Sequence, residues 1–250
     1  MTLVNTSDFQ AIVLAAGKGT RMGSDLPKVL LPVCGRPVIT HILDALGKAG
    51  IQRPVVVVGY KAEKVREALG DRVIYALQKE QRGSGHAVMC ARDAARGAKD
   101  LLIMCGDSPL FRVETISAVM EAHVREDAVI TLASAILDDP TGYGRILRGP
   151  GGEVIGVVEE KIAMPEQKAV KEINGGLYAF DAGWLWESIH LMRENEVGEL
   201  CLTEMVDIAI AQGRKVIAVP IPAEEVAGIN TPEQLRAAER VLSERNGQMG

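Results

Sequence analysis

The sequence contains no long block of lysine and arginine residues. Its 28 Lys and Arg are outnumbered by 33 Asp and Glu, which gives a formal net charge of -5. Proteins that bind nucleic acids or membrane surfaces concentrate positive charge on one face, so this composition argues against both kinds of partner. Basic residues that cluster locally are therefore more informative than the total charge.

Cysteine and histidine are also scarce. The four cysteines lie far apart, without the paired spacing of a zinc site or a disulfide framework, and the four histidines show no metal-ligand spacing. No Ser-His-Asp order or Cys-His pair indicates covalent catalysis. We therefore expect a cytoplasmic protein whose cysteines are reduced.

The sequence has no leader-like segment and no apolar run of membrane length. Its start, MTLVNTSDFQ, lacks a charged region followed by an apolar one, and runs such as PVVVVGY have only the length of a strand. No internal repeat, low-complexity tract or flexible linker is visible. With 250 residues, 47% of them hydrophobic, the chain is long enough to bury a large core.

Strand-like runs and segments of helical period alternate from Gln10 to about Met120. The strand-like runs are AIVLAA, PVVVVGY, RVIYALQ and LLIMCGD, and the helical segments are PVITHILDALGKAG, KAEKVREALG and GHAVMCARDAARG. This alternation predicts an α/β fold with βαβ units around a mostly parallel sheet. The loops that follow the strands then share one edge of the sheet, where such folds bind ligands.

The pattern changes after Ala128. Long strand-like runs joined by GPGG predict a hairpin, and with it a second, partly antiparallel lobe. Helices are expected over about 182–193 and 201–212, followed by the strand KVIAVPIP. A final helix is predicted after Thr231, because Thr231, Pro232 and Gln234 have capping-box spacing with proline at the first helical position.

The first glycine-rich loop, AAGKGTRM, directly follows the first strand. It lacks the spacing of a P-loop, and it lacks the third small residue and the later acid of a dinucleotide fingerprint. Lys18, Arg21 and Lys28 fall within eleven residues that contain one acid, Asp25, and this density suits a polyphosphate. A glycine-rich turn with solvated cations is an equally simple interpretation.

Two later loops carry further candidates. In LQKEQRGSGHAV, Gln78 offers an amide toward a pyrimidine edge, whereas the simpler interpretation is a helix that begins near Gly85 and is capped by Ser84. Asp107 ends the strand-like run LLIMCGD and precedes Ser-Pro, which places a carboxylate at the ligand-binding edge of the sheet. Mg²⁺ usually takes only one or two protein ligands beside phosphates, so one Asp is enough to predict a magnesium site.

Eight motifs, in this order along the chain, resemble the uridyltransferase half of bifunctional N-acetylglucosamine-1-phosphate uridyltransferases. They are LAAGKGTRM, LPKVL, QRGSGHAV, GDSPL, DDPTGYGRI, VVEEK, INGGLY and AGIN, and the similarity extends from about Ile12 to Leu242. The resemblance implies one nucleotidyltransferase domain over 1–250, with a Rossmann-like, mostly parallel mixed sheet. It divides into a nucleotide-binding lobe (about 8–127) and a sugar-binding lobe (about 128–250). The family's β-helical acetyltransferase domain has no counterpart in the sequence, and a monomer is expected.

The resemblance also implies an activity. UTP and N-acetylglucosamine 1-phosphate would react, with Mg²⁺, to give UDP-N-acetylglucosamine, a cell wall precursor, and pyrophosphate. The sugar phosphate would attack in line, without a covalent intermediate. Arg21, Lys28 and Asp107 would be catalytic, with Arg21 at the leaving pyrophosphate. The implied ligand-binding residues are Leu14, Ala15, Ala16, Gly17, Gln78, Gly83 and Ser84 for the nucleotide, Gly144, Glu159, Asn174 and Thr203 for the sugar, and Asp107 and Asn230 for the metal.

Several positions depart from the family pattern. Ser84 replaces a usual Thr, and Cys105 stands where an aromatic residue is frequent. On the sugar side, Leu200 and Cys201 replace a Tyr pair, and Gly175 follows Asn174 where Thr or Ser is usual. Three alternatives therefore stay open: a different sugar 1-phosphate such as glucose 1-phosphate, a different nucleotide such as dTTP, or a non-catalytic sugar-nucleotide sensor.

Overall fold

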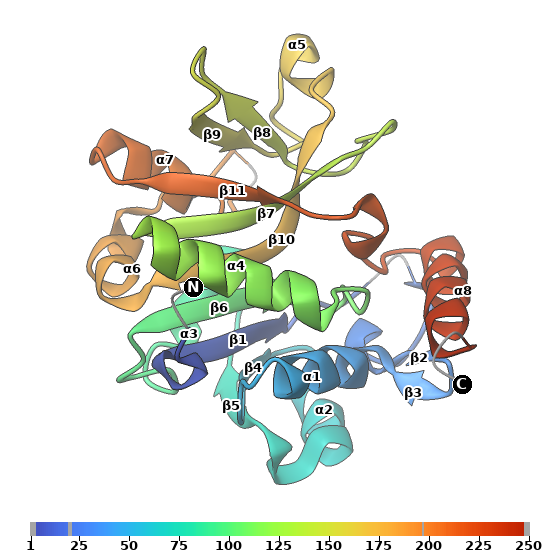
Figure 1. Ribbon diagram of the computed structural model, residues 1–250. Helices are drawn as coiled ribbons and strands as arrows, with labels where there is room; N and C mark the ends of the chain where they lie inside the picture. The colour runs from blue at the N-terminus through green and yellow to red at the C-terminus, as the bar shows by residue number, and fades with distance from the viewer. Residues whose placement is uncertain (1–3, 20–21, 197, 248–250) are drawn as a thin grey trace.

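The computed structural model describes residues 4–19, 22–196 and 198–247, which fold around one central sheet (Figure 1). Within these residues the sheet has nine strands, in the order β11-β7-β10-β6-β1-β4-β5, with β8 paired to β10 and β9 paired to β8. Helices cover both faces of the sheet. The apolar residues of α1, α2 and α4 pack on one face and those of α3, α6 and α7 on the other.

The first half of the chain supplies the parallel part of the sheet. Strand β1 pairs in parallel with both β4 and β6, and β4 pairs in parallel with β5. All four valines of β4 are buried, which explains the unbroken apolar run. The predicted βαβ pattern is confirmed, and its elements are β1 (Phe9–Ala15), α1 (Val38–Lys48), β4 (Val55–Val58), α2 (Ala62–Leu69), β5 (Ile74–Leu77), α3 (Ser84–Cys90), β6 (Asp100–Cys105) and α4 (Val113–Glu126).

The second half extends the same sheet. The long strand β10 (Glu172–Asp181) is antiparallel to both β6 and β7 (Ile130–Ile136), and β11 (Val216–Pro220) is parallel to β7. The predicted GPGG hairpin is confirmed by β8 (Arg145–Arg148) and β9 (Val154–Val158). The sheet is therefore mixed: the strands of the first half are parallel, and the second half adds antiparallel pairs, as the sequence predicts.

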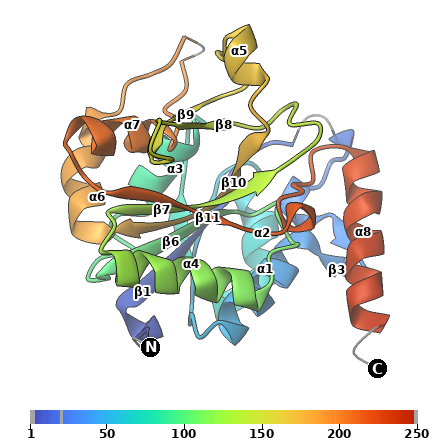
Figure 2. The ribbon, with the colours of Figure 1, turned by 45° about the horizontal axis from the view of Figure 1, so that its top comes forward.

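The remaining elements connect these strands, and α6 and α7 among them pack on one face of the sheet. Helix α8 (Pro232–Gly247) stands apart from the main helical layers, as Figure 2 shows, and it contacts β2. Its predicted capping box is confirmed, since Thr231 Oγ1 accepts from Gln234 N at 3.3 Å and Gln234 Oε1 accepts from Thr231 N at 3.1 Å. The others are η1 (Thr6–Asp8), η3 (Lys28–Leu30), β2 (Pro32–Val33), β3 (Arg36–Pro37), η4 (Gly70–Arg72), α5 (Pro165–Lys168), α6 (Ala182–Ser188), η5 (Ile189–Leu191), α7 (Glu204–Ala211) and η6 (Ala223–Glu225).

Three helix predictions differ from the structure in extent. The segment GHAVMCARDAARG is helical only as far as Cys90 and continues as turns, and the stretch expected from residue 201 becomes α-helical at Glu204. The stretch expected over about 182–193 is α-helical only to Ser188 and continues as η5 to Leu191. No helix among the described residues is both long and apolar enough to cross a bilayer.

Candidate active site

The site lies where parallel strands β1 and β6 end side by side. Leu14 is in register with Cys105, and Gly106 N donates to the Leu14 carbonyl oxygen at 2.8 Å. A Cβ atom at Gly106 would lie 2.8 Å from that same oxygen, so a glycine is required for the two backbones to approach this closely. The loop after each strand therefore starts from a fixed position at one edge of the sheet.

A cavity of about 320 Å³ opens at this edge. It is lined by residues of the loops after β1, β5 and β6, together with Lys28 and Glu199. The structure thus brings together the positions that the resemblance assigns to the nucleotide and two that it assigns to catalysis: Leu14, Ala15, Ala16, Gly17, Gln78, Gly83, Ser84, Lys28 and Asp107.

Gln78 anchors the second glycine loop. Its side chain is buried, and Nε2 donates to the Gly83 carbonyl oxygen at 3.0 Å and lies 3.1 Å from His86 Nδ1. No described residue donates a hydrogen bond to its Oε1. The amide oxygen is therefore an acceptor at the cavity wall, held in place by the bonds of its own nitrogen.

The prediction that Ser84 caps α3 is wrong. The N-cap residue is Gly83, with φ of 103°, and Ser84 is the first helical residue. Ser84 Oγ instead accepts from Leu202 N at 2.9 Å. The reason is tertiary, because a Cβ atom at Gly83 would lie 2.4 Å from the Leu200 carbonyl oxygen, and this packing sets where the helix begins. The second glycine loop is thus fastened to the segment that leads into Thr203.

Lys28 and Asp107 line the cavity, and Asn230 lies against Lys28. Lys28 Nζ forms an ion pair with the Asp107 carboxylate and donates to Asn230 Oδ1 at 2.9 Å. The Lys28 and Asp107 side chains are only 15% and 19% exposed. Two oxygen ligands from strand-end loops therefore face a common point where a positive charge already sits.

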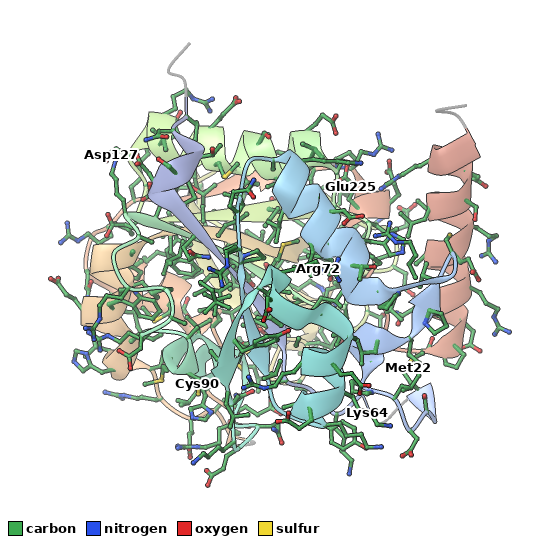
Figure 3. All side chains as sticks on the ribbon, turned by 90° about the horizontal axis from the view of Figure 1, so that it is seen from below. Met22, Lys64, Arg72, Cys90, Asp127 and Glu225 are labelled. Atoms are coloured by element: carbon green, nitrogen blue, oxygen red, sulfur yellow. The ribbon has the colours of Figure 1, made fainter. Side chains whose placement is uncertain are left out.

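The loops that carry Asp107 and Asn230 are tied together behind this point. Ile229 N donates to the Asp107 carbonyl oxygen at 2.9 Å. Farther back, the fully buried Glu225 accepts from Arg112 N at 2.9 Å and lies 3.6 Å from Arg112 Nε. Glu225 is labelled in Figure 3, which shows it between the layer of α1 and the separate helix α8. These contacts fix the separation of the two oxygen ligands.

The four residues that the resemblance assigns to the sugar also lie together. Asn174 N donates to the Gly144 carbonyl oxygen at 2.9 Å, and Thr203 Oγ1 donates to Glu159 Oε1 at 2.7 Å. A Cβ atom at Gly144 would lie 3.6 Å from both Asn174 Cβ and Glu159 Oε2, which shows how close the two pairs are. They come from β10, the two ends of the hairpin and the residue before α7.

Three further ionisable side chains surround this cluster and carry no charge at neutral pH. Burial raises the pKa of Tyr178, whose hydroxyl is hydrogen-bonded to Asn174 Nδ2. Burial likewise raises the pKa of the Cys105 thiol to about 12 and that of Cys201 to about 11, and nearby carboxylates add to both shifts. Because a thiol must ionise to attack, neither cysteine is an activated nucleophile.

A sequence profile of the MobA-like NTP transferase domain matches residues 11–150. The chain belongs to this family. It is 47% identical over 238 residues to the Bifunctional protein GlmU of Heliobacterium modesticaldum, covering 94% of this chain and 52% of the relative. The protein of the same name from Thermoanaerobacter pseudethanolicus is 42% identical over 235 residues, covering 94% of this chain and 51% of the relative. The chain thus spans about half the length of the curated relatives it matches.

The fold is that of a sugar nucleotidyltransferase. A Bacillus anthracis protein described as a candidate glucose-1-phosphate thymidylyltransferase, crystallised with sucrose, superposes with a TM-score of 0.78 at 20% identity, covering 93% of this chain and 94% of the other. The family resemblance and the fold class predicted from the sequence are confirmed, and the chain is a nucleotidyltransferase.

The predicted site and the site in the structure do not coincide at every residue. Arg21, predicted to be catalytic, lies outside the described residues. Conversely, Tyr178 and Glu225, which support site residues in the structure, are not predicted from the sequence. Tyr178 lies in a strand-like apolar run, and Glu225 belongs to an acidic pair of the kind usually found at the surface. No local pattern distinguishes either of them from an ordinary residue.

Proposed function

We propose that the chain transfers a uridylyl group from UTP to N-acetylglucosamine 1-phosphate, giving UDP-N-acetylglucosamine and pyrophosphate. One observation carries the proposal. Three parts form one connected site: the strand-end cavity, the Lys28–Asp107–Asn230 group, and the cluster of Glu159, Thr203 and their neighbours. They are connected because Glu199 and the segment before Thr203 border both the cavity and this cluster. The relatives named GlmU support it, and the proposal concerns only the half of those proteins that the chain matches.

The nucleotide would occupy the cavity at the ends of β1 and β5. Backbone N–H groups of the loop 14–17 suit phosphate oxygens, which need donors but no particular side chain. The Gln78 amide oxygen would accept from the uracil ring N–H, with Gly83 and Ser84 completing that wall. Arg21 is proposed to bind the leaving pyrophosphate.

The reaction would proceed by positioning and charge neutralisation. An oxygen of the sugar phosphate attacks the α-phosphorus of UTP as the bond to the β-phosphate oxygen breaks, and the bonding electrons leave with pyrophosphate. Lys28, which now neutralises Asp107, would move onto the phosphates of the two reactants. No residue has to form a covalent bond.

Mg²⁺ is part of the proposal, and the residues present fit it. The Asp107 carboxylate and Asn230 Oδ1 are oxygen ligands aimed at one point, and the Lys28 ammonium shows that this point accommodates a cation. No group of three or more His, Cys, Asp or Glu in the described parts of the chain has a metal-binding arrangement. When bound, Mg²⁺ would neutralise and align phosphate oxygens of both reactants. Asp107 and Asn230 would hold it.

The sugar would lie against Gly144, Glu159, Asn174 and Thr203. The Glu159 carboxylate and the Asn174 amide suit sugar hydroxyl groups, and Gly144 leaves room beside them.

A lobe boundary near 127–128, a monomeric state and a cytoplasmic location belong to the same proposal. The four cysteines are free thiols, consistent with a reducing compartment.

The test is pyrophosphate release from a panel of UTP and dTTP with N-acetylglucosamine 1-phosphate and glucose 1-phosphate. The proposal predicts fastest release for UTP with the N-acetylated sugar. Equal turnover of glucose 1-phosphate would defeat the sugar assignment, and preference for dTTP would defeat the nucleotide assignment. Binding of UDP-sugar without any release would indicate a sensor.

A further inference from the structure

His86, in the first turn of α3, contacts the wall of the strand-end cavity without lining it. Gln78 and Gly83 line the cavity, whereas His86 is not among the described residues that do so. Its Nδ1 lies 3.1 Å from Gln78 Nε2, and its Nε2 lies 3.8 Å from the Sγ of Cys90, one helical turn farther on. The direct connection from the imidazole to a bound nucleotide is therefore the Gln78 side chain.

The Gly83 carbonyl group determines the orientation of the Gln78 amide. A carbonyl oxygen can only accept, so the amide atom that lies 3.0 Å from it must be the nitrogen. This nitrogen has a second N–H, which is available to His86 Nδ1. Because an amide nitrogen only donates, Nδ1 must be the acceptor and carries no proton. His86 is therefore the neutral tautomer with its proton on Nε2, on the side of Cys90.

The surroundings suit this neutral imidazole. Gln78 is only 3% exposed, so an amide N–H without an acceptor would be costly there, and the Gly83 oxygen and His86 Nδ1 together satisfy both N–H groups. On the other side of the ring, burial raises the pKa of the Cys90 thiol, so the sulfur has no negative charge at neutral pH that would favour an imidazolium.

Both acceptors oppose a reversed Gln78 amide. If the amide turned over, Oε1 would face the Gly83 oxygen and the unprotonated His86 Nδ1, and neither can donate to it. Oε1 therefore stays available at the cavity wall as an acceptor. Uracil has an N–H at ring position 3 and can donate to it, whereas cytosine has an unprotonated nitrogen at that position and would leave Oε1 unpaired.

We propose that His86 is a positioning residue for the choice of base: its neutral imidazole accepts the second N–H of Gln78 and so holds the amide oxygen toward the N3–H of uracil and against cytosine. The inference rests on the proposed function, which places the base beside Gln78.

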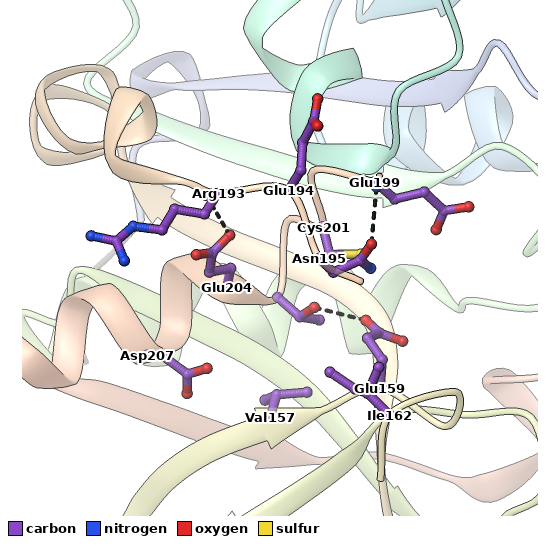
Figure 4. A pocket seen from close by; sticks show the side chains of 11 residues that line it. Val157, Glu159, Ile162, Arg193, Glu194, Asn195, Glu199, Cys201, Glu204 and Asp207 are labelled. Atoms are coloured by element: carbon purple, nitrogen blue, oxygen red, sulfur yellow. Dashed lines mark hydrogen bonds between the residues drawn. The ribbon is translucent and has the colours of Figure 1, made fainter. Parts of the chain in front are cut away.

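The role of His86 is confined to the nucleotide end of the site. Figure 4 shows the pocket beside the proposed sugar residues, where Glu159 and Cys201 are among the lining side chains. His86 is not among the described residues that line this pocket. A change at His86 should therefore alter the KM for the nucleotide, while the KM for the sugar phosphate changes less than about twofold.

Two variants of matched shape test the proposal. Leucine and asparagine both branch at the γ-carbon, but only asparagine offers an oxygen near the position of His86 Nδ1. His86→Leu therefore removes the acceptor for Gln78, His86→Asn keeps one, and both lose the contact with Cys90. Leucine is the better helix former of the two, so a loss confined to His86→Leu cannot come from a weakened α3.

The measurement is the dissociation constant of UTP, dTTP and CTP, each with Mg²⁺, by isothermal titration calorimetry. The wild type should bind UTP at least about 100-fold more tightly than CTP. His86→Leu should narrow this ratio about tenfold, and His86→Asn should keep it within about threefold of the wild type. The ratio of UTP to dTTP affinity should change less than about twofold in either variant, because uracil and thymine present the same N3–H.

A His86→Leu protein that folds, as thermal unfolding reports, and keeps the wild-type ratio of UTP to CTP affinity would overturn the role of His86. The same conclusion would follow if His86→Asn behaved like His86→Leu, or if the ratio of UTP to dTTP affinity fell as far as that of UTP to CTP. A wild type that does not distinguish UTP from CTP would overturn both the nucleotide assignment and the inference. Selective UTP binding without uridylyl transfer would overturn the proposed activity, and the affinity ratios would still decide the role of His86.

The tautomer can also be tested in the wild type, without any variant. Nitrogen-15 NMR of the histidine side chains at about pH 8, where an ordinary imidazole is neutral, should show His86 with its proton on Nε2 and none on Nδ1. A proton on Nδ1 would overturn the inference, because it would face the Gln78 N–H.

Discussion

The two ends of the site are built differently. At the proposed nucleotide end, parallel β-strands deliver short loops to one edge of the sheet, and close backbone contacts such as Gly106 to Leu14 fix them. At the proposed sugar end, side chains converge from β10, a hairpin and the residue before α7. On this proposal, binding by backbone groups at one end would tolerate side-chain change, whereas binding by side chains at the other would make ligand choice sensitive to single residues.

The largest expected effect comes from Asp107, just after β6 at the cavity wall. Asp107→Ala should lower kcat for pyrophosphate release by about 100- to 1000-fold, because it removes the proposed metal ligand and the partner of Lys28. Thermal unfolding should change little. Asp138→Asn, which removes an exposed partner of Lys171, is the matched control and should leave kcat unchanged. A folded Asp107→Ala enzyme with wild-type turnover would sink the metal assignment.

Replacing Lys28 should separate metal binding from catalysis. Lys28→Met should lower turnover about 100-fold yet raise the affinity of the ligand-free protein for Mn²⁺ roughly tenfold, because the ammonium no longer competes for the Asp107 and Asn230 oxygens. Mn²⁺ titration followed by electron paramagnetic resonance measures this. Lys215→Met, which breaks an exposed ion pair with Glu126 just before β11, at the opposite edge of the sheet, should leave the affinity as it is. Weaker Mn²⁺ binding in Lys28→Met would contradict the proposal that the Lys28 ammonium and the metal ion occupy the same position.

A smaller effect should be confined to the sugar end. Glu159→Gln keeps the shape of the side chain but weakens the hydrogen bond from Thr203 and the interaction with sugar hydroxyls. The KM for the sugar phosphate should rise about tenfold, while the KM for UTP changes less than about twofold. Glu153→Gln, in the exposed hairpin turn, serves as the control. Equal increases in both KM values would show that the two ends are not separable.

The smallest effect concerns alkaline pH. The raised pKa of Cys201, about 11, means that the folded state holds the thiol proton while the unfolded chain loses it near its ordinary value of roughly 8.5. This contribution is complete below the unfolded pKa and is lost as pH rises toward about 11. Urea unfolding from pH 8 to 10.5 should show a shallower decline for Cys201→Ser than for the wild type. If the stability of the wild type and of Cys201→Ser declined equally with pH, burial would not be raising the pKa of the Cys201 thiol.

The same contrast explains what could be predicted from the sequence. The strand before the first loop, Asp107 and the Thr231 capping box are encoded by neighbours within a few residues, and the structure contains each of these features. The capping role predicted for Ser84 was wrong because packing against Leu200, which lies far along the chain, sets where α3 begins. Tyr178 and Glu225 act through Asn174 and Arg112, and no local periodicity reports such partners.

The most direct test of the account is phosphorus-31 NMR of the protein mixed with UTP, N-acetylglucosamine 1-phosphate and Mg²⁺. The account predicts that UDP-N-acetylglucosamine and pyrophosphate appear in equal amounts as both substrates disappear. Release of pyrophosphate with UMP in place of the sugar nucleotide, or no reaction while UTP is bound, would contradict it.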